Sequence, residues 1–136
     1  MKYYISLIGL LIIFGCSKTP DDIPIASYAD IEAIVTFSVN MSAQIESGNF
    51  NIDSDFLDIA GTFNDWDGSN DYLIKTNINI YEISFTNFEV GEEIEFKFRI
   101  NGNWNTAEFP TGSNRQYVII QGNNNLELWY NDEDGS

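Results

Sequence analysis

The sequence has no histidine and only one cysteine among its 136 residues. Without histidine, a His-based catalytic triad and a His-liganded metal site are both excluded. The single cysteine, Cys16, excludes an intramolecular disulfide. Long hydrophobic runs are also missing: the longest, Ile5 to Phe14, has about ten residues, against the roughly 20 that a membrane-spanning helix needs.

Basic residues are scarce as well. The chain has 6 Lys and Arg against 21 Asp and Glu, which gives a net charge of −15. A surface of this charge repels nucleic acid, whose binding depends on cations that neutralise phosphates, and it also repels anionic lipid headgroups and polyanionic polysaccharides. The simplest partner is therefore a neutral molecule, although the acidity can also serve only to keep the protein soluble.

The N-terminal segment 1–15 has the pattern of a secretory signal, with Lys2 followed by the short apolar run. The run ends in Ile13-Phe14-Gly15-Cys16, which resembles a bacterial lipobox and predicts that Cys16 is acylated and becomes the new N-terminus. Several acyl chains would give stable membrane anchoring. An ordinary signal peptide with an incidental cysteine remains the alternative.

Residues 16–32 predict a flexible tether, because they contain Pro20 and Pro24 and few large apolar residues. Lys18 and Asp21-Asp22 resemble a surface-export signal of some Gram-negative lipoproteins, although a solvated linker explains them equally well. We expect lipid anchoring at the bacterial outer membrane, on the cell surface or the periplasmic face.

From residue 33 onward, apolar residues alternate with polar ones. The clearest run is Glu93 to Ile100, in which every even position is apolar and every odd position is charged. Such alternation is typical of strands with one wet face. Further strand-like runs are 35–41, 56–60, 73–75, 81–85, 116–120 and 126–130. Together they predict an all-β antiparallel sandwich of seven to eight strands over residues 33–131. We expect a long loop at 42–55 and an acidic tail at 132–136.

The pair Asn101-Gly102 predicts how Trp104 is placed. Asn-Gly is the preferred sequence for a two-residue type I′ hairpin, since both positions need a positive φ. That turn would pair Arg99 with Trp104 and set Trp104 on the same face as Lys97 and Arg99, away from the core phenylalanines. A slip of one residue would reverse the face.

An indole on a wet face is suited to stacking against a sugar ring, with Lys97 and Asn114 available for hydrogen bonds to hydroxyl groups. Trp66 lies in a turn directly after a strand and is a second candidate. Two structural alternatives remain open: Trp104 covers an apolar edge of the sandwich, or Trp66 plugs one end of the core. For Trp129, in a terminal strand, we expect a structural role.

Four motifs occur in a specific order. They are Gly61-Thr62-Phe63-Asn64-Asp65-Trp66, Phe96-Lys97-Phe98-Arg99-Ile100, Trp104 and Asn114-Arg115-Gln116-Tyr117. Because these four motifs occur in this order, the sequence from about Val35 to Asn131 resembles the starch- and glycogen-binding domains of carbohydrate-binding module families twenty and forty-eight.

The resemblance implies an immunoglobulin-like sandwich with a shallow surface site for α-glucan. In such domains two tryptophans stack on consecutive glucose units, and Trp66 and Trp104 match them. Lys97 and Asn114 match the residues that hydrogen-bond glucose hydroxyls. The loop 42–55 matches no motif of these families, and most of their members are attached to a catalytic domain.

We therefore expect a non-catalytic, lipid-anchored protein that binds a neutral polysaccharide, with α-glucan favoured. No catalytic residue, cofactor, metal site or nucleic acid is expected, and other envelope proteins are possible partners. The alternative is a β-sandwich subunit of an envelope complex that serves protein interaction. A third reading, a glycoside hydrolase, requires two carboxylates that face each other across a cleft.

Overall fold

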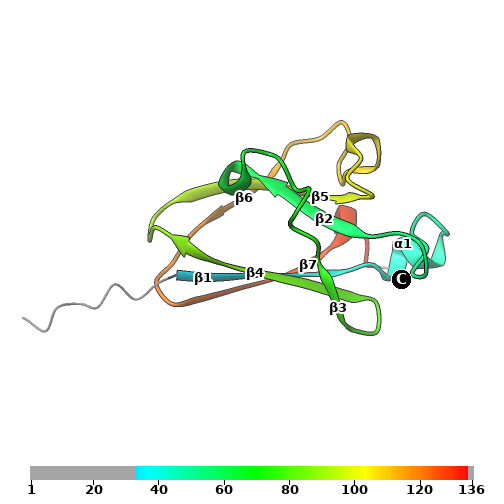
Figure 1. Cartoon of the computed structure of the whole chain (residues 1–136), viewed down its shortest axis with the longest axis horizontal. Coiled ribbons are helices and arrows are strands. Elements are labelled where there is room, and N and C mark those ends of the chain that lie inside the picture. Colours follow the sequence, from blue (N-terminus) through cyan, green and yellow to red (C-terminus); the bar gives the residue numbers. More distant parts are fainter. Residues whose placement is uncertain (1–32, 135–136) are drawn as a thin grey trace, which may run out of the picture.

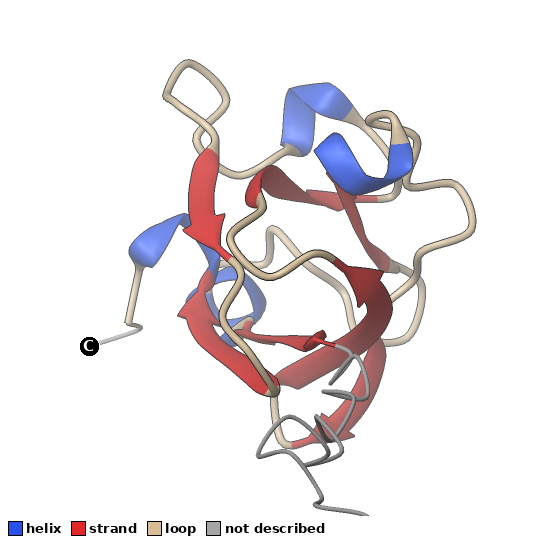
Figure 2. Cartoon of the chain, turned by 90° about the vertical axis from the view of Figure 1, so that its left-hand side faces the viewer, coloured by secondary structure: helices blue, strands red, loops and turns tan. Residues whose placement is uncertain are grey.

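The computed structural model describes residues 33–134, which form two packed β-sheets (Figure 1). One sheet has the strand order β3-β4-β1-β7, and the other has the order β2-β5-β6. Seen after a turn of 90°, the strands form two stacked layers joined by loops (Figure 2). The strands are β1 (Ala33–Asn40), β2 (Leu57–Gly61), β3 (Ile74–Asn77), β4 (Ile80–Phe88), β5 (Glu93–Ile100), β6 (Arg115–Val118) and β7 (Asn123–Trp129).

Alternation along each strand places one set of side chains between the sheets. On β5, Ile94, Phe96 and Phe98 are buried in the core. On β1, Val35, Phe37 and Val39 are fully buried, and the residues between them are only partly so. Phe37 is the central ring of this core, since it contacts four other phenylalanines. They are Phe63, Phe85, Phe96 and Phe98.

The predicted all-β sandwich is confirmed, and the described part of the chain contains seven strands. One strand pair differs from the antiparallel prediction. The first strand, β1, pairs antiparallel with β4 on one side and parallel with β7 on the other. Alternation cannot reveal this direction, because a strand shows the same polar and apolar faces whichever way its neighbour runs.

The predicted loop at 42–55 needs a correction. Its first part is a short helix, α1 (Ser42–Glu46). Further along it, Phe50 is buried at 2% exposure and lies edge-on to Tyr81, with ring centroids 5.4 Å apart. A single helical turn is too short to show a 3.6-residue period, and Phe50 stands alone among polar residues, so neither feature has a sequence pattern.

The predicted signal segment, Cys16 and the tether lie outside the described residues. Between residues 33 and 134, no helix has the length and apolar character needed to cross a membrane. At the other end, two residues assigned to an acidic tail bond to the sandwich. Asp132 forms an ion pair with Arg115 at 2.8 Å, and Glu133 accepts a hydrogen bond from Gln44 at 2.6 Å.

Candidate functional site: a tryptophan pair on the outer face of one sheet

The outer face of the β2-β5-β6 sheet carries the residues that the sequence singled out. Asp58 lies opposite Arg99, and Ala60 lies opposite Lys97, so these pairs share a face. The intervening phenylalanines of β5 point into the core. Two loops cross this outer face, one after β2 and one after β5, and each carries a tryptophan.

Trp66 is presented by a backbone in an uncommon conformation. After the short helix η2 (Thr62–Asn64), Asp65 has φ +52° and Trp66 has φ +60°. Positive φ is rare for bulky side chains and persists only where the surroundings enforce it. Here the Trp66 amide donates to the Gly61 carbonyl at 2.9 Å, which closes the turn.

Asn64 holds this turn in place. Its Oδ1 accepts a hydrogen bond from the Gly61 amide at 2.8 Å. Its Nδ2 donates to the Ile59 carbonyl at 3.0 Å and to the Asp71 carboxylate at 2.7 Å. One amide side chain thus ties the end of β2 to both sides of the loop, which fixes the position from which the Trp66 ring projects.

Trp104 follows the predicted tight turn, since Asn101 has φ +55° and Gly102 has φ +65°. The predicted pairing beyond the turn is wrong. The chain enters a short helix, η3 (Trp104–Thr106), and it is Ala107 that lies opposite Arg99. The predicted face is nevertheless correct, because the Trp104 ring lies over the side chain of Arg99.

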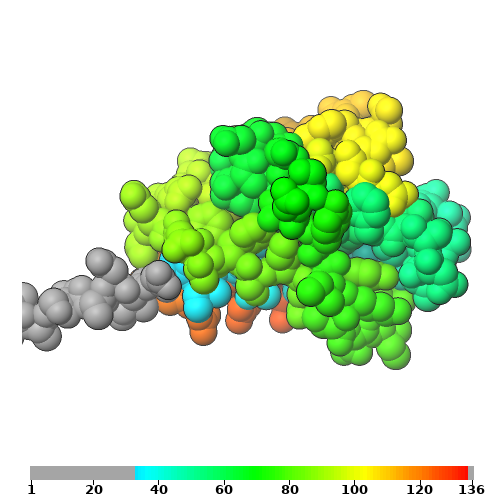
Figure 3. Space-filling view, viewed as in Figure 1, coloured from blue at the N-terminus to red at the C-terminus, as the bar shows by residue number. Residues whose placement is uncertain are grey.

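The two indole rings are neighbours. Their centroids are 6.1 Å apart, and their planes are tilted by 49°. Trp104 is 47% exposed, and Trp66 is half-buried. The space-filling view shows the segments around residues 66 (green) and 104 (yellow) side by side on one surface of the molecule (Figure 3).

A buried ion pair supports Trp104 from below. The Arg99 guanidinium carbon lies 4.5 Å from the centre of the indole. The same guanidinium donates two hydrogen bonds to the Asp58 carboxylate, at 3.0 and 2.7 Å. Burial raises the pKa of Asp58, and the paired Arg99 opposes part of that rise. One face of the Trp104 ring is thus covered by a planar cation held at two points.

Lys97 lies on the outer face as predicted, but the loop after η3 covers it. Only 7% of the residue is exposed. Its ammonium donates to the carbonyls of Phe109 at 2.6 Å and Gly112 at 3.1 Å. An ammonium has three N–H donors, so one of the three has no hydrogen-bond partner among residues 33–134.

Asn114 is anchored beside the same strand. Its Nδ2 donates to Glu95 at 3.0 Å, and Gln116 donates to the other oxygen of that carboxylate at 2.9 Å. The hydrogen bond from Asn114 has the larger effect and that from Gln116 the smaller, and both lower the pKa of Glu95. The Oδ1 of Asn114 has no hydrogen-bond partner within residues 33–134 and is open to a hydroxyl donor.

Sequence reasoning missed a buried group behind the site. Glu108 is fully buried, and its carboxylate accepts from the Phe98 amide and from Arg115. Burial raises the pKa of Glu108, an effect that Arg115 opposes. Arg115 also donates to the carbonyl of Trp129, so it joins the two sheets. The motif containing Arg115 was visible in the sequence, but its partner at residue 108 was not.

Comparisons with known proteins support the fold. No protein-family model matches the sequence, and no curated protein sequence matches it. Among solved structures, the chain is similar to a glycoside hydrolase family 15 glucoamylase from Hypocrea jecorina, with a TM-score of 0.55 and 17% identity. The match covers 74% of this chain and 17% of the glucoamylase. At this identity the likeness shows a shared sandwich fold with a small part of a much longer enzyme.

Proposed function

We propose that the protein binds a neutral polysaccharide, with α-glucan favoured, through Trp66 and Trp104. The observation that carries this proposal is the pair of adjacent indoles, 6.1 Å apart, on an outer sheet face, one of them half exposed. Exposed indoles stack well on the apolar faces of sugar rings, and burying an aromatic ring removes about 150–250 Å² from water. The resemblance to starch-binding domains and the fold shared with part of a glucoamylase point to the same ligand class.

The tilt of the rings favours a curved ligand. A flat, extended glucan would stack best on two coplanar rings, whereas these planes differ by 49°. An α-linked glucan changes direction from one sugar to the next, so consecutive rings can each meet one indole. The free donor of Lys97 and the free oxygen of Asn114 would then supply polar contacts.

The site is proposed to bind without catalysis. Glycoside hydrolysis requires two carboxylates that face the scissile bond. Near the tryptophans, the Asp58 carboxylate is held by Arg99, and further along the strand Glu95 is held by two amides. Release of reducing sugar from starch by the purified protein would contradict this part of the proposal.

We also propose that the protein is a lipoprotein anchored through Cys16, because the only cysteine follows the apolar run after a single small residue, Gly15. One shallow site binds weakly, and display of many copies on a membrane would add avidity. The test is detergent phase partitioning of the full chain expressed in a Gram-negative host, with intact-mass analysis. Cys16→Ser should lose both the added acyl mass and the detergent-phase fraction.

The binding test is native gel electrophoresis through gels that contain starch, glycogen, pullulan or laminarin. We expect α-glucans to slow the soluble domain, and Trp104→Ala or Trp66→Ala to reduce the retardation strongly. Val90→Ala, at an exposed position in the turn between β4 and β5, is the control and should behave as wild type. Unaltered wild-type mobility in all four gels would overturn the proposal and favour the protein-interaction alternative.

A further inference from the structure

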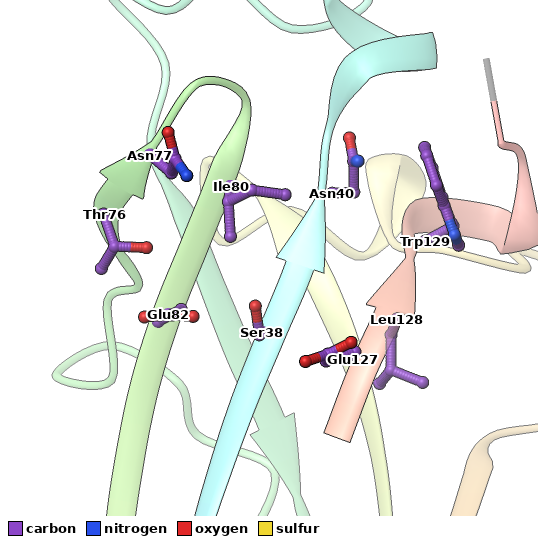
Figure 4. Close-up of a pocket in the computed structure, with 9 residues that line it drawn as sticks. All are labelled: Ser38, Asn40, Thr76, Asn77, Ile80, Glu82, Glu127, Leu128 and Trp129. Carbon is purple, nitrogen blue, oxygen red and sulfur yellow. The ribbon is translucent and has the colours of Figure 1, made fainter. Parts of the chain in front are cut away.

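A cavity lies on the outer face of the other sheet, on the opposite side of the sandwich from the tryptophan pair. Its volume is about 490 Å³, within the 300–1,000 Å³ typical of small-molecule sites. Figure 4 shows the side chains that surround it. They are Ser38, Asn40, Thr76, Asn77, Ile80, Glu82, Glu127, Leu128 and Trp129.

The strand register arranges these side chains in two rows across the sheet. Ser38 on β1 is aligned with Glu82 on β4 and with Glu127 on β7. Two residues further along β1, on the same face, Asn40 is aligned with Ile80 and with Trp129. Because aligned residues share a face, an indole and an aliphatic side chain flank an amide, next to a row with a hydroxyl between two carboxylates.

Trp129 forms one wall of this cavity. The sequence predicted a structural role for this residue, yet 38% of it is exposed. It is the last residue of β7, and its carbonyl accepts a hydrogen bond from Arg115 at 2.7 Å, which fixes the backbone there. Figure 4 shows its ring at the edge of the cavity, beside Asn40.

The polar groups in the cavity are available to a ligand. Within the described part of the chain, the Ser38 hydroxyl and the carboxylates of Glu82 and Glu127 have no hydrogen-bond partner. The Oδ1 of Asn40 accepts from the amide and hydroxyl of Ser42, which leaves its NH₂ group as a donor. The cavity thus offers acceptors, a donor and a hydroxyl that can do either.

This chemistry selects a ligand class. Two carboxylates with no Lys or Arg among the lining residues repel a phosphate or a carboxylate. A wholly apolar ligand would leave the polar groups without partners. A sugar ring satisfies both conditions, since its hydroxyls donate to carboxylates and accept from an amide while its apolar face meets the indole.

We propose that this cavity binds a sugar unit of a neutral polysaccharide and is a second carbohydrate site, independent of Trp66 and Trp104. This proposal is based on the aromatic and polar residues that line the cavity. It therefore does not require that the cavity and the tryptophan pair bind the same glycan. Two sites on opposite faces would let one protein molecule bridge two polysaccharide chains.

The first experiment isolates Trp129. In the double variant Trp66→Phe/Trp104→Phe, Trp129 is the only tryptophan left in the chain. Its fluorescence and its indole N–H resonance are followed during titration with maltoheptaose, laminarihexaose or spermidine. We expect a saturable change with at least one of the two oligosaccharides. No change with either sugar at millimolar concentration, or a change with spermidine alone, would overturn the proposal.

The second experiment separates the two sites in otherwise native protein. Mixing wild type with a long polysaccharide that binds at both sites should give turbid, cross-linked complexes. Trp129→Ala should abolish the turbidity and keep the gel retardation that the tryptophan pair provides. Trp104→Ala should also abolish the turbidity, lose the part of the retardation that the pair provides, and keep the Trp129 response. Trp129→Phe, which retains a stacking ring, should restore at least part of the turbidity. Turbidity that survives in Trp129→Ala would contradict a second site.

Discussion

Arg99 lies directly beneath Trp104, with its guanidinium carbon 4.5 Å from the centre of the indole, and is itself held by Asp58. The pair is buried, with side-chain exposures of 7% for Arg99 and 1% for Asp58. A planar cation that is fixed by a bidentate contact is a rigid support for a ring. The orientation of the proposed sugar platform therefore depends on a residue that itself lies below the exposed surface.

Asp58→Asn should weaken both stability and binding. The substitution leaves the buried Arg99 without its counter-charge, which costs about 3–5 kcal/mol. Urea denaturation measures the loss, and gel retardation by the glucan measures the effect on the platform. Asp53→Asn is the matched control, because its carboxylate is exposed and in no ion pair of the described residues. A change below about 0.5 kcal/mol is expected there.

Much of the fold could be predicted because strand alternation is a local property. The even positions of β5 are in the core, as their apolar identity predicted. The turn at Asn101-Gly102 also forms as its sequence predicted, with a positive φ at both residues. These features need only neighbouring residues and the two-residue period.

Features that depend on distant segments could not be predicted in the same way. Lys97 is covered because residues 109–112 return over its strand, and that loop has no periodic pattern. Trp129 lines a cavity because β7 lies beside β1, which brings it level with Asn40. The sequence places these residues on strands or loops but does not show what lies next to them.

Lys97→Met should loosen the covering loop. Two hydrogen bonds from the ammonium to loop carbonyls are lost, which costs about 1–3 kcal/mol. The amide of Gly112 donates to the Phe109 carbonyl, so its hydrogen exchange should become faster. Lys75→Met, at an exposed position, should change neither quantity. Unchanged exchange at Gly112 together with weaker glucan binding would instead indicate that Lys97 acts only on the ligand.

The hydrogen bond that holds Asn114 against the Glu95 carboxylate should be sensitive to acid. Because the pKa of Glu95 is lowered in the folded protein, its stabilising contribution is fully present above the unfolded-state value of about 4.3. It is lost as the pH falls through the lower folded value. Glu95→Gln should therefore be less stable than wild type at neutral pH, and the difference should vanish in acid.

The measurement is the urea midpoint of both proteins from pH 7 to pH 3, together with the side-chain amide resonances of Asn114, which should shift with the titration of Glu95. Glu93→Gln, on the same strand with an exposed side chain, is the control and should show no such dependence. A constant difference between wild type and Glu95→Gln across this pH range would contradict the role assigned to the carboxylate.

Gly68→Ala should displace the loop that carries Trp66. A methyl group at this position would lie 2.5 Å from the Ile59 carbonyl oxygen and 2.9 Å from an Arg99 nitrogen. The carbonyl belongs to the β2 backbone and cannot easily move, so the loop must shift, at a cost of about 1–3 kcal/mol. The shift also disturbs the guanidinium below Trp104, so we expect weaker gel retardation as well as lower stability.

Gly91→Ala separates the two effects, because its φ of +90° strains an alanine while no atom lies within 4 Å of the added carbon. It should lose stability but keep full retardation, and normal retardation in Gly68→Ala would show that the position of Trp66 does not depend on this close contact.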